Sequence, residues 1–67
     1  MKVIDFIKTI RDLEYKLTFE FREGNDFLKK EIVDNVYSID SKLLDRKINN
    51  WFVDFEKQEI VIDLEKE

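Results

Sequence analysis

The sequence contains no cysteine, no histidine, no proline and a single glycine. Without cysteine or histidine there is no disulfide framework, no zinc finger, no thiol nucleophile and no histidine-based acid–base pair. One glycine cannot form the glycine-rich loop that cradles phosphates. The longest apolar runs are three residues, at 51–53 and 60–62, so we expect neither a membrane span nor a signal peptide. The cytoplasm is therefore the expected compartment.

The sequence does contain a high density of bulky apolar side chains. Apolar residues make up 43% of the 67 residues and include six phenylalanines, whereas alanine is absent. A domain of about 60 residues buries only about 60% of its unfolded surface, and large aromatic side chains compensate because each buries a large area. We therefore expect residues 1–67 to form a single small folded domain.

Charge is distributed unevenly along the chain. Residues 1–53 carry ten acidic and ten basic side chains, whereas residues 54–67 carry six acidic side chains and two lysines. The net charge of −4 therefore lies entirely in the last part of the chain. Because a basic footprint is absent, we do not expect direct nucleic-acid binding. An acidic end is suited to a partner protein with a basic surface.

Two periodic patterns predict the first two elements. Apolar side chains at helical spacing predict an amphipathic helix over residues 2–13. These side chains are Val3, Phe6, Ile7, Ile10 and Leu13. Apolar and polar residues then alternate from Tyr15 to Arg22, which predicts a strand with one face on the core. Residues 23–26 contain the only glycine and predict a turn.

The segment 26–40 allows two interpretations. Four apolar residues recur there at helical spacing, namely Leu28, Ile32, Val36 and Ile39. A preceding Asn25 or Asp26 would cap such a helix. The alternative is a pair of short strands separated by a turn at Asp34-Asn35. We favour the helix, followed by a connector over residues 40–45 that contains one helical turn whose leucines fill the core.

The last third of the chain predicts a β-hairpin. Pairing residues whose numbers add to 115, across a loop at Lys57-Gln58 or a longer loop over 56–59, places six apolar side chains on one face. These are Trp51, Val53, Phe55, Ile60, Ile62 and Leu64. A slip of one residue would turn one strand over and scatter them. The predicted fold class is therefore α+β: an N-terminal helix, an antiparallel sheet with a C-terminal hairpin, and a second helix.

The other face of this hairpin is the predicted partner-binding site. It contains Phe52, Asp54, Glu56, Glu59, Asp63 and Glu65, together with Val61. Alternate strand residues lie about 7 Å apart, roughly the spacing of successive phosphates along a nucleic-acid strand. Carboxylates at this spacing match a groove built for a phosphate backbone, and an aromatic side chain among charges is typical of an interface hot spot. Phe52 is the predicted anchor.

Other interpretations of this face remain open at this point. The acids can form an ordinary solvated surface, with Phe52 and Val61 covered by the segment 26–40 or by a second copy of the chain. A divalent-cation site is not expected, because no calcium-binding loop is present and strand carboxylates do not converge. Nothing places a base beside a hydroxyl or lysine nucleophile, and so small a core has no room for an active-site pocket. We therefore expect no enzyme, no cofactor and no metal.

Residues 1–11, followed by the strand at 15–19, resemble the beginning of many short phage and prophage proteins of low-GC Gram-positive bacteria. Among these, the pattern is similar to that of small type II-A anti-CRISPR proteins, which also place an amphipathic helix before an antiparallel sheet. Residues 43–51, followed by the hairpin, have a similar character. The resemblance implies an acidic inhibitor, acting inside the host cell, that occupies the nucleic-acid-binding cleft of a host nuclease.

Two alternative functions come from the residues themselves. The first is a structural module that forms a homodimer through the face around Phe52. The second is a small regulator that contacts nucleic acid through Lys42, Arg46 and Lys47.

Overall fold

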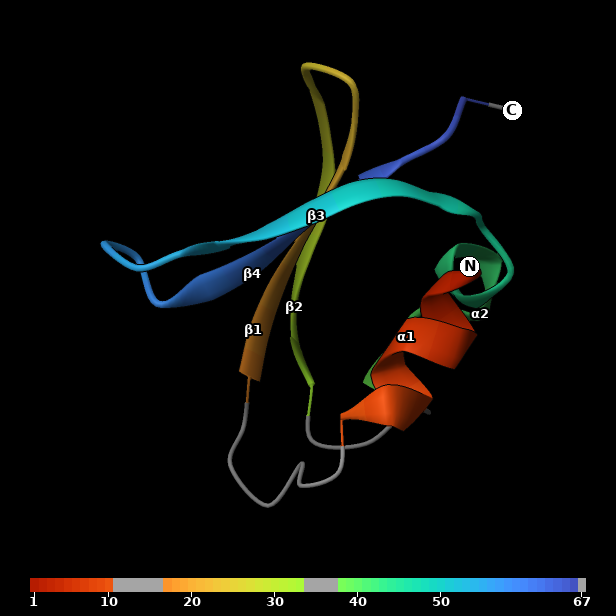
Figure 1. Ribbon diagram of the computed structural model, residues 1–67, viewed down its shortest axis with the longest axis horizontal. Helices are drawn as coiled ribbons and strands as arrows, with labels where there is room; N and C mark the ends of the chain where they lie inside the picture. Colours follow the sequence, from red (N-terminus) through yellow and green to blue (C-terminus); the bar gives the residue numbers. More distant parts are fainter. Residues whose placement is uncertain (11–16, 34–37, 67) are drawn as a thin grey trace.

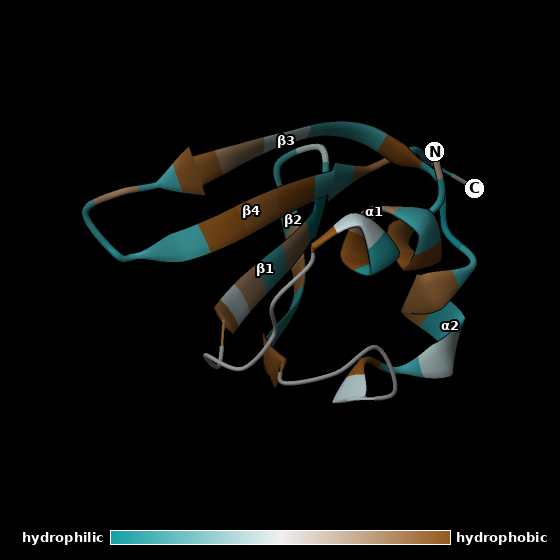
Figure 2. Cartoon of the chain, turned by 60° about the horizontal axis from the view of Figure 1, so that its bottom comes forward, coloured by the Kyte–Doolittle hydropathy of each residue, from teal (hydrophilic) through white to brown (hydrophobic). Residues whose placement is uncertain are grey.

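The computed structural model describes residues 1–10, 17–33 and 38–66. Along the chain, the elements are α1 (Val3–Thr9), β1 (Leu17–Glu23), β2 (Asp26–Val33), α2 (Ser41–Leu44), β3 (Ile48–Asp54) and β4 (Glu59–Leu64). The strands form one sheet in the order β2-β1-β4-β3, and the two helices lie side by side on one side of it (Figures 1 and 2). The α+β class is confirmed, with its N-terminal helix, C-terminal hairpin and short second helix.

Two hairpins meet in the middle of the sheet. β1 pairs antiparallel with β2, and β3 pairs antiparallel with β4. β1 and β4, however, run parallel, with Thr18 opposite Glu59 and Arg22 opposite Asp63. The predicted antiparallel pairing is therefore found within each hairpin, whereas the two hairpins dock through a parallel pair. Hairpin signals report strands that are neighbours in sequence, and they carry no information on how two hairpins dock.

Helix α1 is shorter than predicted. It begins after Lys2, whose backbone N–H donates to the Asp5 carboxylate at 3.2 Å. The hydroxyl of Thr9 donates to the carbonyl of Phe6, which a continuing α-helix would offer to the N–H of residue 10. Ile10 has an extended backbone instead, and its N–H donates to the carbonyl of Ile7. The helix therefore ends at Thr9, and Leu13 lies outside the described residues.

The core lies between α1 and the sheet. Val3, Phe6 and Ile7 of α1 are buried, as predicted from their helical spacing. The sheet contributes side chains that are almost fully buried: Phe19, Phe21, Ile62 and Leu64. The inward alternation of β1 is thereby confirmed for residues 19 and 21, whereas Tyr15 lies outside the described residues. Val33, Ile39 and Leu43 complete the core.

Helix α2 is the single helical turn predicted in the connector over residues 40–45. The Asp40 carboxylate accepts a hydrogen bond from the backbone N–H of Lys42 at 3.0 Å and so caps its start. This hydrogen bond, with Lys29 nearby, lowers the pKa of Asp40 below its usual value. Leu43 is buried and Leu44 packs against the core, as predicted.

The predicted helix over residues 26–40 is wrong for the part of the segment that the structure describes. Residues 26–33 form strand β2, and residues 34–37 lie outside the described residues. Leu28 and Ile32 fit a helical stripe, but residues an even number apart also share one face of a strand. Gly24 has a φ of +62° and stands at the first central position of a two-residue hairpin loop, where a type II′ turn takes glycine. This turn favours a strand after it.

The register of the β3–β4 hairpin differs from the prediction by two residues. Paired numbers add to 113, with Trp51 opposite Ile62 and Asp54 opposite Glu59. A shift by two keeps the predicted face of every strand residue, so the apolar pattern alone cannot distinguish the two registers. The loop covers residues 55–58, and Gln58 adopts a left-handed φ of 57° within it. Phe55 therefore lies in the loop, 85% exposed, rather than on the inner face.

Trp51 is not the core residue that the hairpin pattern predicts. Its ring packs on Phe6, with centroids 4.9 Å apart and planes tilted by 54°. Nevertheless 47% of the residue is exposed, because it lies on edge strand β3 and α1 has only seven residues to cover the sheet.

We expect Phe21→Ala and Trp51→Ala to differ in cost. Truncating a buried aromatic residue costs about 3–5 kcal/mol, enough to leave a domain of this size largely unfolded. Because Trp51 is only about half buried, its truncation is expected to cost roughly half as much, ~2 kcal/mol. Urea unfolding followed by circular dichroism measures both. Equal losses would show that Trp51 is as important to the core as Phe21.

Gly24 tests the hairpin turn. No atom lies within 4 Å of the place where a Cβ would be, so only its left-handed backbone opposes a side chain. We expect Gly24→Ala to cost about 1 kcal/mol, and Gly24→Asn to cost less because asparagine tolerates this conformation. Urea unfolding measures both, and an alanine variant as stable as the wild type would contradict the assigned turn.

Candidate functional site

One face of the sheet has no described element over it, since both helices lie on the other side (Figure 2). We call it the open face, and it consists of the strand residues that point away from α1. Four of its large apolar side chains are between 39% and 64% exposed. They are Phe27, Leu28 and Ile32 on β2 and Phe52 on β3. The open face therefore presents far more apolar surface than the single anchor that the sequence predicts.

Two buried glutamates lie between these apolar side chains. Glu20 and Glu59 are both less than 10% exposed. Lys30 Nζ lies 2.9 Å from Glu59 Oε1 and 3.9 Å from Glu20 Oε1, while Arg22 Nε donates to Glu20 Oε2. The hydrogen bond to Glu59 raises the pKa of Lys30 above its usual value of 10.5. This ion-pair network links β2, β1 and β4 across the open face.

Among the described residues, Glu59 forms an ion pair with one cation, Lys30. Its second oxygen, Oε2, is buried and has no hydrogen-bond partner among the described residues. A buried carboxylate that lacks partners is costly, because it has lost the water that would otherwise solvate it. Lys30 is thus the group that makes burial of this carboxylate tolerable.

Three of the acidic residues that were predicted to bind a partner form stabilising contacts within the chain instead. Glu59 is paired with Lys30. Asp63 accepts hydrogen bonds from the Gly24 backbone N–H at 2.9 Å and from Asn49 Nδ2 at 3.2 Å. Asp54 accepts from the backbone N–H of Lys57 at 3.1 Å, within the tip of the hairpin. These three carboxylates lie on the open face, but each is already engaged by a group within the chain.

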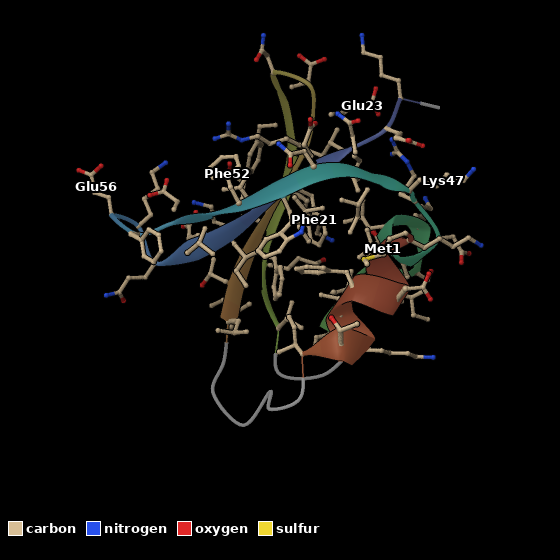
Figure 3. All side chains as sticks on the ribbon, viewed as in Figure 1. Met1, Phe21, Glu23, Lys47, Phe52 and Glu56 are labelled. Atoms are coloured by element: carbon tan, nitrogen blue, oxygen red, sulfur yellow. The ribbon has the colours of Figure 1, made fainter. Side chains whose placement is uncertain are left out.

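The other predicted residues are exposed. Glu56 lies in the tip loop of the hairpin and Glu65 just beyond the end of β4. Neither carboxylate has a hydrogen bond or ion pair with another described residue. Phe52 lies midway along β3, with Glu56 at one end of the molecule and Lys47 at the other (Figure 3). The predicted row of five carboxylates is thus divided, and only Glu56 and Glu65 present uncompensated charge.

Val61 needs no covering segment. It is 1% exposed because it lies between two long side chains of the flanking strands, Glu20 on β1 and Phe52 on β3. Residues 26–33, which we considered as a cover for this face, extend the same sheet instead.

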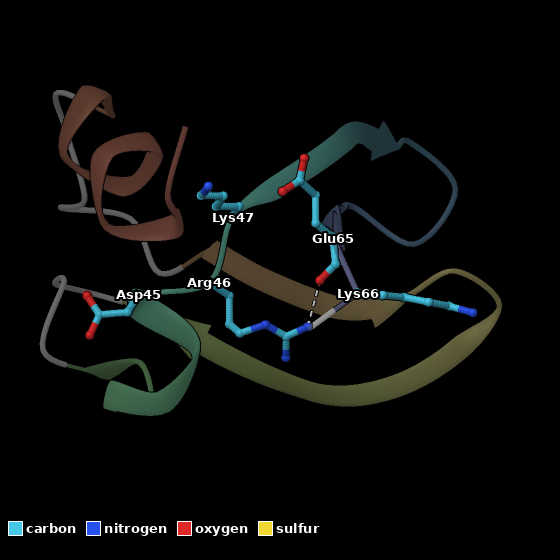
Figure 4. A pocket seen from close by; sticks show the side chains of 5 residues that line it. All are labelled: Asp45, Arg46, Lys47, Glu65 and Lys66. Carbon is cyan, nitrogen blue, oxygen red and sulfur yellow. Dashed lines mark hydrogen bonds between the residues drawn. The ribbon is translucent and has the colours of Figure 1, made fainter.

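Arg46, one of the basic residues considered for contact with nucleic acid, is already bound by groups within the chain. The Arg46 side chain is 13% exposed, lies 2.7 Å from Glu23 Oε2 and donates to the backbone carbonyl of Glu65 at 2.8 Å. It lines a shallow depression of about 280 Å³ with Asp45, Lys47, Glu65 and Lys66 (Figure 4). Charges of both signs line this depression, so it does not form the uniformly positive surface that a phosphate requires.

Phe27, Leu28 and Ile32 were missed by the sequence interpretation because segment 26–40 was taken as a helix. The signal that would have found them is the two-residue loop after β1, which makes the following residues a hairpin strand. In that strand Leu28, Lys30 and Ile32 share one face.

No protein-family model, no curated protein and no solved structure matches the chain. Among the described residues, no helix is long and apolar enough to cross a membrane. In the same part of the chain, no three acidic side chains gather closely enough to hold a metal ion.

The role of Lys30 can be tested through Lys30→Met, with Lys57→Met in the exposed tip loop as the matched control. Removal of Lys30 leaves Glu59 and Glu20 buried with less compensation, so we expect Lys30→Met to lower the free energy of unfolding clearly more than the control. Adding Glu59→Gln to Lys30→Met should recover part of the loss, because the amide carries no charge.

The loss of unfolding free energy caused by Lys30→Met should also depend on pH. The folded-state pKa of Lys30 is raised, so its stabilising contribution is fully present below about pH 10.5 and is lost as the pH rises through the folded-state pKa. The stability difference between wild type and Lys30→Met should therefore shrink in this alkaline range. A difference that stays constant there in urea unfolding would contradict the pairing.

Proposed function

We propose that this chain is a non-enzymatic protein-binding module that engages its partner through the open face of the sheet, with Phe52 as an anchor. One observation supports this above all others: four large apolar side chains lie exposed on one uncovered face. Three of them, Phe27, Leu28 and Ile32, lie close together on β2, while Phe52 lies across the sheet on β3. Exposed apolar side chains that gather on one face mark sites of interaction. Between 39% and 64% of each of these residues is exposed and is available for a partner to cover.

The surroundings of Phe52 fit such an interface. Phe52 lies opposite Val61 on β4, and the paired charges of Glu20, Lys30 and Glu59 lie farther across the same face. Interfaces commonly combine aromatic and aliphatic anchors with polar groups that already have partners. Because the charges of this network are already paired with one another, a partner can cover this region without having to compensate a new buried charge.

The charge of the chain favours a partner with a basic surface. The net charge of −4 comes from residues 54–67, and Glu56 and Glu65 present carboxylates without a compensating cation among the described residues. Complementary charge at the rim of an interface accelerates association and selects among partners. The two carboxylates lie at opposite ends of the hairpin, so a basic protein surface would meet them at two places along its rim.

The more specific proposal is a phage-encoded inhibitor of a host nucleic-acid-binding protein, acting inside the host cell. It rests on the resemblance of residues 1–11 and 15–19 to small type II-A anti-CRISPR proteins. The target would be an RNA-guided nuclease, whose nucleic acid lies in a positively charged channel. A compact acidic protein at the entrance of such a channel would compete with DNA.

A purified type II-A RNA-guided nuclease, loaded with guide RNA, provides the test. We expect the chain to bind this complex and to inhibit cleavage, with weaker inhibition as target DNA is raised. Phe52→Ala should increase the dissociation rate, because it removes an apolar anchor. The absence of binding to this nuclease would exclude the specific proposal. Equal binding by wild type and Phe52→Ala would exclude the anchor.

The role of charge is tested by a matched pair of double variants. Glu56→Lys with Glu65→Lys, and Asp26→Lys with Asp45→Lys, both change the formal charge from −4 to zero, since each swap adds two units. Only the first pair removes the acids at the proposed interface, so only it should slow association strongly at low salt. If both variants slow association equally, net charge alone is responsible.

A further inference from the structure

The two edges of the sheet are protected to different degrees. Edge strand β2 carries Lys29, Lys30 and Glu31 and is interrupted by a bulge opposite Phe21 and Arg22. Charges and bulges are the usual means by which proteins prevent strands from pairing with other chains. Edge strand β3 has a register shift near its beginning, between Ile48 and Asn50, but it is regular from Asn50 to Asp54 and has no charged residue and no proline from residue 48 to residue 53.

The unprotected edge of β3 is apolar on both faces. Trp51, Phe52 and Val53 are consecutive, and each is between 39% and 47% exposed. Consecutive strand residues point to opposite faces, so apolar surface is exposed above and below the same edge. A strand added there would bury side chains on both faces while pairing the backbone groups at the edge.

Only the beginning of this edge is occupied. The Ile48 N–H donates to the Met1 carbonyl at 2.8 Å, and the Val3 N–H donates to the Arg46 carbonyl at 2.9 Å. Lys2 thereby pairs with Lys47 as an isolated antiparallel bridge. Among the described residues, β4 is the only other strand that pairs with β3, so its outer side is open from residue 50 to residue 54.

We propose that two copies of this chain pair antiparallel through the open edge of β3 and form a continuous eight-stranded sheet. In an antiparallel pair, opposite residues share a face, so a two-fold axis must place one residue opposite itself. Centring the pair on Phe52 sets Phe52 opposite Phe52 and Trp51 opposite Val53 of the second copy. Centring it on Trp51 would set Phe52 opposite Asn50 and bring Asp54 against Ile48, where Met1 already lies.

Charge supports a second copy as the occupant and sets its direction. The beginning of β3 carries the Met1 amine, Lys2 and Lys47 against Glu65, and its end carries Asp54 and Glu56 against Lys57, so these groups leave the beginning net positive and the end net negative. Figure 3 shows Met1 and Lys47 at one end of the molecule and Glu56 at the other. Antiparallel pairing brings each acidic end to the basic end of the other copy, and parallel pairing would bring like charges together.

Pairing in the plane of the sheet goes beyond the proposed function and does not depend on it. The open face stays uncovered in such a dimer, and the two open faces become one surface with Phe52 at its centre. A stack of two open faces would instead bury Phe52 together with Ile32, which lies on strand β2 at the opposite edge. The positions of Phe52 and Ile32 thus distinguish the two arrangements.

Sedimentation equilibrium of the protein alone is the first experiment. We expect a reversible dimer, at least about tenfold weaker in Phe52→Lys, which places two like charges opposite each other. Ile32→Lys makes the same chemical change on the open face at the other edge and should leave the dimer intact. A monomeric wild type up to about 1 mM, or equal dissociation by both variants, would overturn edge pairing.

Single cysteines provide the second experiment, which does not require a charge at the interface. The chain has no cysteine of its own, so each variant carries one thiol. Residues opposite each other in an antiparallel pair have Cα atoms about 4.5–5.5 Å apart, within the range of a disulfide. Phe52→Cys should therefore oxidise to a covalent dimer much faster than Ile32→Cys. Equal rates for the two variants would overturn the pairing, even if the wild type is dimeric.

Discussion

The parallel pairing of β1 with β4 is the constraint on which the rest of the structure depends. It joins two hairpins into one sheet and gives each of the two central strands a neighbour on both sides. Phe19 and Phe21 on β1 and Ile62 on β4 thereby meet on a single face. A helix of only seven residues is then enough to cover them. The same pairing leaves β2 and β3 as the edge strands, so it also determines which strands other molecules can reach.

The two faces of the sheet are covered in different ways. On one face, α1 and the leucines of α2 exclude water from an apolar core. On the other, long side chains cover the strands themselves: the Lys30–Glu59 pair lies over the middle of the sheet, and Val61 is buried between Glu20 and Phe52. Because this second cover is one side chain deep, the apolar residues at its rim stay exposed.

Local patterns predicted the local parts of the fold. The spacing of Val3, Phe6 and Ile7 identified α1, the alternation of Phe19 and Phe21 identified β1, and the connector helix and C-terminal hairpin were also found. Patterns of apolar residues cannot reveal which hairpins dock, nor a register shift of two that preserves every face. For the site, Phe52 was placed correctly as an exposed aromatic. The roles of Asp63 and Glu59 depend on Gly24 and Lys30, which are distant in sequence and therefore could not be inferred.

The hydrogen bond from the Gly24 N–H to Asp63 has a consequence for the order of folding. Each hairpin forms from neighbouring residues and needs little loop closure, whereas the seam between them joins distant segments and should form later. Until then, the inner faces of both hairpins remain in water, and this interval is when misassociation with other chains is most favoured. The Gly24 amide receives its carboxylate partner only after the hairpins dock. The rate at which the Gly24 N–H exchanges with deuterated solvent therefore reports the docking of the two hairpins. It does not report the formation of the turn that contains Gly24.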